Sequence, residues 1–572
     1  MQMKAGHIDM RKNWKIYDEN QRLQKVLSEE IGISPFFAQL LLNRDLLDPD
    51  KAKEFLFGGL AACADPFLMK DMAKAVDRIM LAGKNNEKVL VYGDYDVDGV
   101  TSTALLYDIL TRMGIACETF IPNRLEEGYG LNIRAIALAR DHGIKLLITV
   151  DCGINSVEEV KCANEYGIDV IITDHHEVKG EERPPALATI DPHQPDCGYP
   201  YKTLAGVGVA YKLAKALMKD SPQVADGHLD LVALGTIADV VPLNGENRIL
   251  AKSGLGKLKM TEKEGIKALM EISGIVPEKI TCRHIGFGLG PRINAMGRVG
   301  SANVALELLL AKDPSTARQL ARRLNDENKN RQNIEKEIFK DAYQNAKDSH
   351  DPDRDNIIVL AGESWHPGVI GIVASKLSEE FLKPVILIAM DGENGKGSGR
   401  GVEGFDLFSA INASSGYLVD FGGHEQACGI KIKRDNIEKF REAINAAAPE
   451  HFVEKGHTVP DLKIDMKIPF SHIGVKLVNE LEMLMPYGPD NSEPVFCTGG
   501  VRVKTRPRDI GRSGFKFLVS CGNMTCEAVT FRKNDVDKPE QGDIIDLAYT
   551  PSINSWNGID SIQLNIKDLH KI

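Results

Sequence analysis

Residues 88–99 read KVLVYGDYDVDG, an apolar run followed by three aspartates and a glycine. Two later segments share this plan, LLITVD at 146–151 and VIITDHH at 170–176. A short β-branched run followed by carboxylates is typical of a buried parallel strand with a polar tip. In open α/β sheets, ligands bind at this carboxyl end of the strands. The three segments therefore predict a crevice lined by several carboxylates and two imidazoles.

The negative charge of this predicted crevice requires a cation, because uncompensated charges are costly to bury together. Asp94, Asp96 and Asp98 alternate along the chain, and alternate residues of an extended segment share a side. With Asp151 and the histidines at neighbouring strand ends, metal binding is favoured over an ordinary acidic turn. Oxygen ligands with an imidazole suit Mn²⁺ or Mg²⁺ better than zinc. Two such ions would support metal-assisted hydrolysis of a phosphate ester.

Two histidines and one further aspartate extend this prediction. Adjacent residues of a strand do not both face one ion comfortably, so His175 is assigned as a ligand. His176 is then a group that supports the ligands or contacts phosphate. Asp239 lies in the apolar segment LGTIADVVPL (234–243), where an unpaired carboxylate would be costly. It is a further candidate ligand, with a structural aspartate at a helix end as the alternative.

The composition predicts a globular protein of two to four domains, since 572 residues are too many for one core. The chain is 43% hydrophobic and 26% charged. Its ten cysteines are scattered without a CxxC pair, which favours reduced thiols in a cytoplasm. We expect neither a signal peptide nor a membrane span, because no suitable apolar run occurs. The net charge of -11 argues weakly against electrostatic coating of nucleic acid but allows a local basic site.

The pattern along the chain predicts a multidomain α/β protein. Strands alternate with helices between about 71 and 240, as in doubly wound folds. After Pro314 no Gly or Pro occurs until beyond 348, which predicts a helix ~50 Å long, and its polar middle predicts a bridge between domains. The predicted parts are an N-terminal helical segment (1–70), an α/β catalytic domain (71–312), a connecting helix (313–350), a second α/β domain (351–455) and a C-terminal β-barrel (456–572).

Basic residues lie in Gly-rich segments that are candidates for anion binding. The segment GPRINAMGR (290–298) is predicted as a Gly-rich loop with two arginines, which suit phosphate contacts, with surface ion pairs as the alternative. The segments GKGSGR (395–400) and FGGH (421–424) are typical of loops whose amides bind anions, or of ordinary flexible turns. Glycines 286, 288 and 290 superficially resemble a dinucleotide-binding loop, but no strand–turn–helix context supports that function.

Taken together, residues 94–99, Asp151, residues 174–176 and Asp239 resemble the four motifs of the DHH phosphoesterase family. Combined with segments 290–298, 365–374 and 421–424, they resemble one branch, the bacterial exonucleases that degrade single-stranded DNA from its 5′ end. The resemblance extends from about residue 70 to the end. It implies a DHH domain, a long connecting helix, a DHHA1 domain and a C-terminal OB-fold barrel, which agrees with the layout above.

The resemblance also implies a role for each motif residue. The family's metal positions, which hold two Mn²⁺ or Mg²⁺ ions, fall on Asp94, Asp96, Asp151, His175 and Asp239. Asp98 and His176 match further motif positions and are assigned catalytic roles. Contacts with the 5′ phosphate fall on Ser398 and Arg400, with Arg124 and His424 as further candidates. The path of the strand falls on Arg292, Asn294 and Arg298. No motif residue is replaced, so we expect an active enzyme.

The expected function is hydrolysis of single-stranded DNA from the 5′ end to 5′-mononucleotides, in DNA recombination and repair, by a cytoplasmic monomer. The resemblance also implies a single-strand-binding protein as partner. The lack of a GxxxxGK[ST] motif implies dependence on a helicase or an existing gap. Three alternatives remain: a family phosphodiesterase for short oligonucleotides or cyclic dinucleotides, a scaffold without metals, and a plain single-strand-binding module. The barrel and the arginine segment argue against the first, and the intact carboxylates against the other two.

Overall fold

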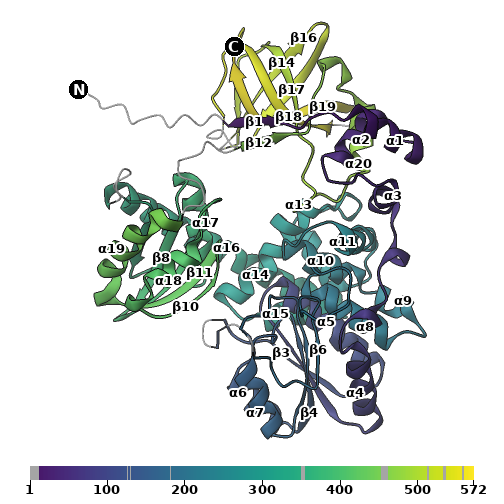
Figure 1. Cartoon of the computed structure of the whole chain (residues 1–572), viewed down its shortest axis with the longest axis vertical. Coiled ribbons are helices and arrows are strands. Elements are labelled where there is room, and N and C mark those ends of the chain that lie inside the picture. The colour runs from purple at the N-terminus through teal and green to yellow at the C-terminus, as the bar shows by residue number, and fades with distance from the viewer. Residues whose placement is uncertain are drawn as a thin grey trace. The chain divides into compact units, whose positions relative to one another are not determined.

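Four sheets organise the computed structural model (Figure 1). The described residues are 12–124, 127–128, 130–180, 182–349, 355–451, 461–511, 514–531, 536–556 and 559–572. They form two compact units. The α/β unit comprises Asp65–Asp239 and Gly254–Gly456, and the barrel unit comprises Met1–Ala64, Val240–Ser253 and His457–Ile572.

The first sheet of the α/β unit is parallel throughout, with strand order β3-β2-β4-β5-β6. Its strands are β2 (Lys88–Gly93), β3 (Cys117–Phe120), β4 (Ile144–Val150), β5 (Asp169–Thr173) and β6 (Ala188–Ile190). Helices cover both faces, as the continuous apolar strands require. One face packs against α6 (Ile133–Asp141) and α7 (Val157–Glu165). The other packs against α4 (Met72–Lys84), α5 (Val97–Arg112) and α8 (Gly206–Leu217).

The register of this sheet aligns the three strand ends that carry carboxylates. Gly93 at the end of β2 pairs with Val150 at the end of β4, and Val150 pairs with Thr173 at the end of β5. The next residues are Asp94, Asp151 and Asp174. The three apolar runs of the sequence therefore end side by side on one edge of the sheet.

Helices connect this sheet to the second one. They include α10 (Leu229–Ala238), α12 (Glu264–Ile272), α14 (Gly290–Val299), α15 (Asn303–Leu310) and α16 (Pro314–Ser349). Helix α16 has 36 residues and contacts α12, α14 and α15 as well as α17 (Ile370–Phe381) of the second α/β region (Figure 1). Segment 290–298, which the Gly-rich pattern predicts as a loop, is helical, because Pro291 occupies the first turn, where proline is tolerated.

The second sheet has the order β10-β11-β9-β8-β7, in which only β7 and β8 are parallel. Its strands are β7 (Ile358–Gly362), β8 (Val385–Asp391), β9 (Asn394–Arg400), β10 (Leu418–His424) and β11 (Ala427–Lys433). The Gly-rich segments 395–400 and 421–424 are thus strands rather than the predicted loops. A Cβ at Gly395 would lie 2.7 Å from Ile388 Cγ2, and one at Gly397 would lie 2.5 Å from Ile430 Cγ1. These glycines make room for packing within the sheet.

The barrel unit contains a sheet of order β13-β14-β18-β19-β17-β16-β15, in which β14 also pairs with β16. That pairing closes a five-stranded ring of β14 (Phe496–Val503), β16 (Gly514–Cys521), β17 (Met524–Thr530), β18 (Ile544–Trp556) and β19 (Ile559–Lys571). Closure removes exposed strand edges, as in an OB barrel. The predicted fold class, a multidomain α/β protein with a parallel sheet, a long connecting helix, a second α/β region and a C-terminal β-barrel, is confirmed.

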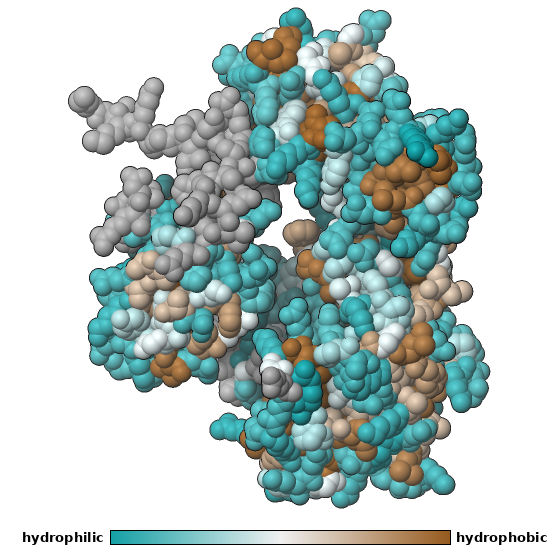
Figure 2. Space-filling model, in the orientation of Figure 1, coloured by the Kyte–Doolittle hydropathy of each residue, from teal (hydrophilic) through white to brown (hydrophobic). Residues whose placement is uncertain are grey.

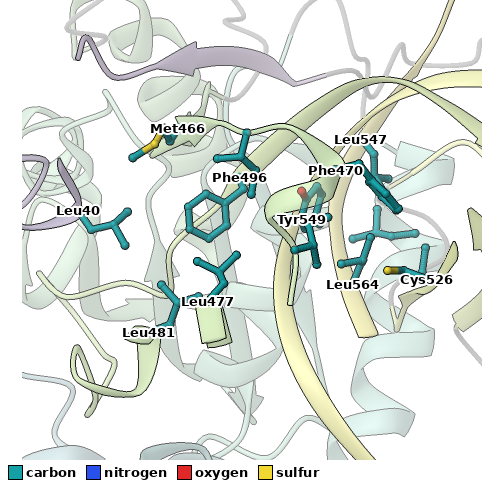
Figure 3. Close-up of a cluster of buried hydrophobic side chains, with 14 of the residues drawn as sticks. Leu40, Met466, Phe470, Leu477, Leu481, Phe496, Cys526, Leu547, Tyr549 and Leu564 are labelled. Atoms are coloured by element: carbon teal, nitrogen blue, oxygen red, sulfur yellow. The ribbon is translucent and has the colours of Figure 1, made fainter. Parts of the chain in front are cut away.

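The N-terminal helices belong to the same hydrophobic core as the barrel. Leu40 of α2 (Pro35–Leu42) is buried in one cluster with Phe496 of β14 and Leu481 of α20 (Val475–Glu482) (Figure 3). Strand β1 (Asn13–Ile16) pairs in parallel with β12 (Asp461–Ile464). The chain thus returns to its own N-terminal region after the α/β unit is complete.

The visible surface is largely hydrophilic, with separate apolar patches (Figure 2). Within the described ranges, no helix is long and apolar enough to cross a membrane.

Candidate metal centre and phosphate-binding residues

The first acidic motif wraps around the start of helix α5. Asp94 follows β2, Asp96 is the N-cap of α5, and Asp98 lies in its first turn. The Oδ1 atom of Asp96 accepts hydrogen bonds from the backbone N–H groups of Asp98 (2.9 Å) and Gly99 (3.1 Å). The motif is thus a strand–turn–helix and not the extended segment predicted from alternation. A Cβ at Gly99 would lie 2.5 Å from the carbonyl oxygen of Asp94, so this tight turn requires glycine.

Asp98 joins this motif to helix α8. Its two carboxylate oxygens accept the backbone N–H groups of Gly206 (2.6 Å) and Val207 (2.9 Å), at the positive end of the helix. A Cβ at Gly206 would lie 2.8 Å from Asp151 Oδ1 and 2.9 Å from Asp98 Oδ2. Gly206 is therefore needed so that the carboxylates of Asp98 and Asp151 can both lie at the start of α8. The sequence alone did not reveal this requirement.

Asp151, His175 and Asp239 bring the remaining predicted ligands to the same place. Asp151 follows β4 with φ of 61°, an uncommon backbone conformation for a residue other than glycine. Asp239 is the C-cap of α10. The Nε2 atom of His175 lies 3.1 Å from Asp151 Oδ1, 3.7 Å from Asp239 Oδ2 and 3.8 Å from Asp98 Oδ2. Asp151 and His175, which follow neighbouring strand ends, therefore lie side by side as predicted, and the end of α10 brings Asp239 to them.

Four of these converging atoms are buried and have no hydrogen-bond partner among the described residues: Asp94 Oδ1, Asp151 Oδ1, His175 Nε2 and Asp239 Oδ2. Ligand atoms lie within 4.8 Å of one another in three sets: Asp94 with Asp96 and Asp151, Asp98 with His175 and Asp239, and Asp151 with His175 and His176. Asp151 belongs to two sets, which suits a carboxylate shared by neighbouring ions. Hard oxygen donors with an imidazole fit Mn²⁺ or Mg²⁺.

The electrostatics of the cluster also favour cations. Burial, followed by repulsion from neighbouring carboxylates, raises the pKa values of Asp94, Asp98 and Asp151 well above their ordinary range. The same causes raise the pKa of Asp239 to about 7. Burial lowers the pKa of His175 to about 4, so its ring is neutral and able to act as a ligand. Bound cations would reverse the cost of ionising these carboxylates.

His176 differs from His175 because Asp174 holds it. Burial opposes a charge on His176, but the hydrogen bond and charge of Asp174 outweigh burial and raise its pKa to about 9. The Nδ1 atom of His176 lies 2.7 Å from Asp174 Oδ1, and Asp174 Oδ2 accepts the backbone N–H of Ile154 at 2.9 Å. The sequence prediction did not give Asp174 this positioning role, although its place in the Asp-His-His motif was a signal for it.

A cluster of guanidinium groups forms the second half of the candidate site. Arg400 of β9 donates to Ser398 Oγ at 3.0 Å and to the carbonyl of Gly399 at 2.7 Å. Burial, followed by repulsion from Arg124, Arg331 and Arg400, lowers the pKa of Arg298 to about 10. The guanidinium of Arg124 lies 5.0 Å from the ring centroid of Tyr95, which stands between Asp94 and Asp96. Like charges drawn together in this way favour an anion.

The other predicted substrate residues contact groups of the protein itself. Asn294 accepts the backbone N–H of Val97 at 3.1 Å, so it braces the first acidic motif. Arg292 donates to the carbonyl of Gly288 at 2.7 Å and to Asn325 at 3.3 Å. His424 ends β10 and pairs with Ala427 of β11, which in turn pairs with Arg400 of β9.

Helix α16 contributes a buried polar stripe that the sequence prediction did not assign to the site. Its members are Asn325, Asn328, Arg331 and Glu335. Arg331 contacts Glu335 and donates to Asn328 at 2.6 Å. The strongly polar middle of the helix was the signal, but its burial depends on neighbours that lie far away in sequence.

Known proteins match this chain over all three predicted domains. Family models match at 88–236 (DHH family, N-terminal domain), 354–450 (DHHA1 domain) and 464–568 (RecJ OB domain). The single-stranded-DNA-specific exonuclease RecJ of Bacillus subtilis is 39% identical over 97% of this chain and 70% of its own length. This chain belongs to the RecJ family. RecJ of Escherichia coli is 34% identical over 88% of this chain and 91% of its own length.

Solved RecJ structures support the same assignment. The crystal structure of Thermus thermophilus RecJ in complex with Mn²⁺ matches with a TM-score of 0.85 and 29% identity. The match covers 99% of this chain and 80% of the other. A complex of the same RecJ with Mg²⁺ matches with a TM-score of 0.79. Those two ions are the ones that the donor atoms of this chain fit.

Proposed function

We propose that this chain is a metal-dependent exonuclease that hydrolyses single-stranded DNA from the 5′ end and releases 5′-mononucleotides. The observation that carries the proposal is the convergence of four buried ligand atoms, on Asp94, Asp151, His175 and Asp239, that have no hydrogen-bond partner. Its relatives in the RecJ family are named single-stranded-DNA-specific exonucleases.

Asp94, Asp96, Asp151, His175 and Asp239 would hold the cofactor, which would be two Mn²⁺ or Mg²⁺ ions. When bound, the ions acidify water and neutralise charge on the phosphate under attack. Asp98 links the first turn of α5 to the start of α8, and so holds the neighbouring ligands in place. His176, protonated through Asp174, provides a cation that attracts the phosphate and can donate a proton to the departing 3′-oxygen.

The guanidinium cluster binds the 5′ end of the strand. Ser398 and Arg400 receive the terminal phosphate, with Arg124 and His424 as neighbouring contacts. Arg298 is the member of this cluster that lies next to the acidic motif. Its charge repels those of Arg400 and Arg124, and a Cβ at the preceding Gly297 would lie 2.6 Å from the carbonyl oxygen of Tyr95. Arg292 and Asn294 extend the path along α14. Anchoring the terminal phosphate would fix which bond reaches the metal centre.

The same proposal extends to the cellular setting. The substrate is single-stranded DNA in recombination and repair, the protein acts as a monomer in the cytoplasm, and a single-strand-binding protein and a helicase present the strand. A phosphodiesterase of short oligonucleotides or cyclic dinucleotides is the second candidate. The closed OB barrel favours a longer strand, because such barrels bind single strands over several nucleotides.

The decisive experiment uses single strands labelled at either end, incubated with Mn²⁺, with Mg²⁺ or with chelator. Release of mononucleotides from the 5′ end only, and only with metal, is the expected result. Disappearance of di- and trinucleotides while long strands survive would establish the second candidate instead. Binding without cleavage in every metal would contradict both.

A further inference from the structure

An exposed phenylalanine stands at the start of the helix that lines the candidate site. Phe287 is 82% exposed, and glycines flank it on both sides. It lies in a π-helical turn, η4 (Ile285–Leu289), that runs directly into α14. π-Helical turns are rare and are frequent at functional sites. The three glycines at 286, 288 and 290 have no role in a dinucleotide loop, so this segment needs another explanation.

The π-helical turn is fixed on its inner side. Ile285 and Leu289 are buried, and η4 packs against α10, which ends at Asp239. A Cβ at Gly290 would lie 3.4 Å from Ala238 Cβ and 3.9 Å from Val97 Cγ2. These are the neighbours of Asp239, Asp96 and Asp98. Phe287 is therefore held on a rigid support beside the metal centre.

Phe287 extends the partly exposed stripe of α14. Pro291, Asn294 and Arg298 follow one another at spacings of three and four residues, which places them on one side of α14, and Phe287 precedes Pro291 by four residues through the π-helical turn. None of the four is buried, whereas Gly290, Ile293 and Gly297 between them are. The stripe begins at the guanidinium cluster with Arg298, passes the acidic motif at Asn294, and ends in an aromatic ring.

We infer that Phe287 stacks against a nucleobase of the single strand, on the 3′ side of the bond that is cut. The inference rests on the proposed function, because it takes its direction from a 5′ phosphate at Arg400 and Arg298. Phe287 and Arg298 are separated by eleven residues, or about 16 Å along a helix. That length equals about five stacked bases at 3.4 Å each, and fewer in an extended strand.

The chemistry of the occupant is that of an unpaired base. Every base presents a π-face to an aromatic ring, so stacking is tolerant of sequence. Such a face is available in a single strand and hidden within a duplex, which would give Phe287 a part in the preference for single strands. The flanking Gly286 and Gly288 have no side chains that could shield the ring.

The test compares Phe287→Ala, Phe287→Trp and the wild type, with Phe57→Ala as control. Phe57 is 62% exposed at the end of α3 (Pro49–Phe57) in the barrel unit, so its truncation also removes an exposed ring. Single strands carry 2-aminopurine at one position from the second to the sixth nucleotide, and fluorescence is measured in chelator so that nothing is cut. KM is then measured with Mn²⁺ on a 20-nucleotide strand.

We expect quenching of 2-aminopurine at one or two adjacent positions in the wild type and in Phe287→Trp, and its loss in Phe287→Ala. The KM of Phe287→Ala should rise about 5- to 100-fold on the long strand, and less on a trinucleotide. An abasic nucleotide at the quenched position should weaken binding of the strand to the wild type but not to Phe287→Ala. Phe57→Ala should match the wild type throughout.

Unchanged quenching and KM in Phe287→Ala, with intact cleavage from the 5′ end, would overturn the inference and leave the proposed function standing. If no strand is cut by the wild type, the proposed function fails. The fluorescence measurement needs no turnover and would still decide whether Phe287 stacks on a base. Because the side chain is exposed, its truncation should leave the thermal midpoint unchanged.

Discussion

The two halves of the candidate site concentrate charge of opposite sign by different means. At the metal centre, short carboxylates are fixed by backbone groups: Asp98 by the amides that begin α8, and Asp96 by the first turn of α5. In the guanidinium cluster, long side chains such as Arg400 and Arg124 reach into the site. The first half is rigid and the second adjustable. Substitutions at the metal centre should therefore remove most of the activity, whereas substitutions in the guanidinium cluster should reduce it by degrees.

Asp151→Asn should have the largest effect. Asparagine tolerates the left-handed backbone that Asp151 adopts, so the strand end should keep its shape. Loss of one anionic ligand should reduce kcat with Mn²⁺ by about 10²- to 10³-fold or more. The metal-free protein should meanwhile become more stable, because one buried carboxylate that repels Asp98 is gone. Steady-state kinetics and thermal unfolding in chelator measure the two changes. A variant that loses both activity and stability would mean that the charge of Asp151 supports the fold.

Arg400→Ala should act mainly on recognition of the 5′ end. Removing hydrogen bonds to a charged group should raise KM for a 5′-phosphorylated strand about 10- to 100-fold. A strand with a 5′-hydroxyl should be affected much less, and Arg400→Lys should recover part of the loss because it restores the charge but not the planar fork. Equal losses on both strands would show that Arg400 does not contact the terminal phosphate.

The stability of the metal-free protein should fall as pH rises. A carboxyl whose pKa is raised by folding stabilises the folded state below its unfolded pKa of about 3.9, and this contribution disappears as pH rises through the folded pKa. Asp239, with a pKa of about 7, is such a group, and Asp94, Asp98 and Asp151 are shifted in the same direction. For each carboxyl that is protonated in the folded state but ionised in the unfolded state, the free energy of unfolding falls by up to about 1.4 kcal/mol per pH unit.

Manganese should reverse this trend, since it binds the ionised carboxylates. The rise in thermal midpoint on adding Mn²⁺ should therefore grow between about pH 5 and about pH 8. Asp151→Asn provides the control, in which the growth should be smaller. A metal-induced shift that is constant across this range would contradict the assignment of the cluster.

The sequence predicted the metal half of the site better than the phosphate half. The strand ends before Asp94, Asp151 and Asp174 were recognisable because apolar runs and the acidic residues after them are local features. Segments 290–298 and 395–400 were predicted as loops, since glycine and proline usually mark turns. Their true states depend on tertiary packing, for example on Ile388 and Ile430 beside the glycines of β9. No local pattern reveals such neighbours.

The same limit applies to contacts between distant parts of the chain. Residues 240–253 belong to the barrel unit, although they directly follow the candidate ligand Asp239. In that unit the guanidinium of Arg248 donates to the carbonyls of Phe55 and Leu484, both at 2.8 Å. A buried arginine with backbone partners so far away in sequence has no signature of its own, so the sequence could not show where this segment packs.

Gly371→Ala should have the smallest effect and tests the rigid-versus-adjustable comparison directly. A Cβ at Gly371, the second residue of α17, would lie 2.9 Å from Ser398 Oγ and 3.0 Å from an Arg400 guanidinium nitrogen. Both atoms end rotatable side chains and can move, so KM for a 5′-phosphorylated strand should rise only about two- to tenfold. Stability should hold or increase, because alanine favours a helix more than glycine by about 1 kcal/mol.

Two further variants serve as controls for Gly371→Ala. Gly416→Ala, whose Cβ would meet nothing within 4 Å, should leave KM unchanged. Gly206→Ala would place its Cβ 2.8 Å from the Cβ of Asp151, which cannot swing away, so it should reduce activity about as strongly as Asp151→Asn. If Gly371→Ala were as damaging as Gly206→Ala, the phosphate half would be as rigid as the metal half.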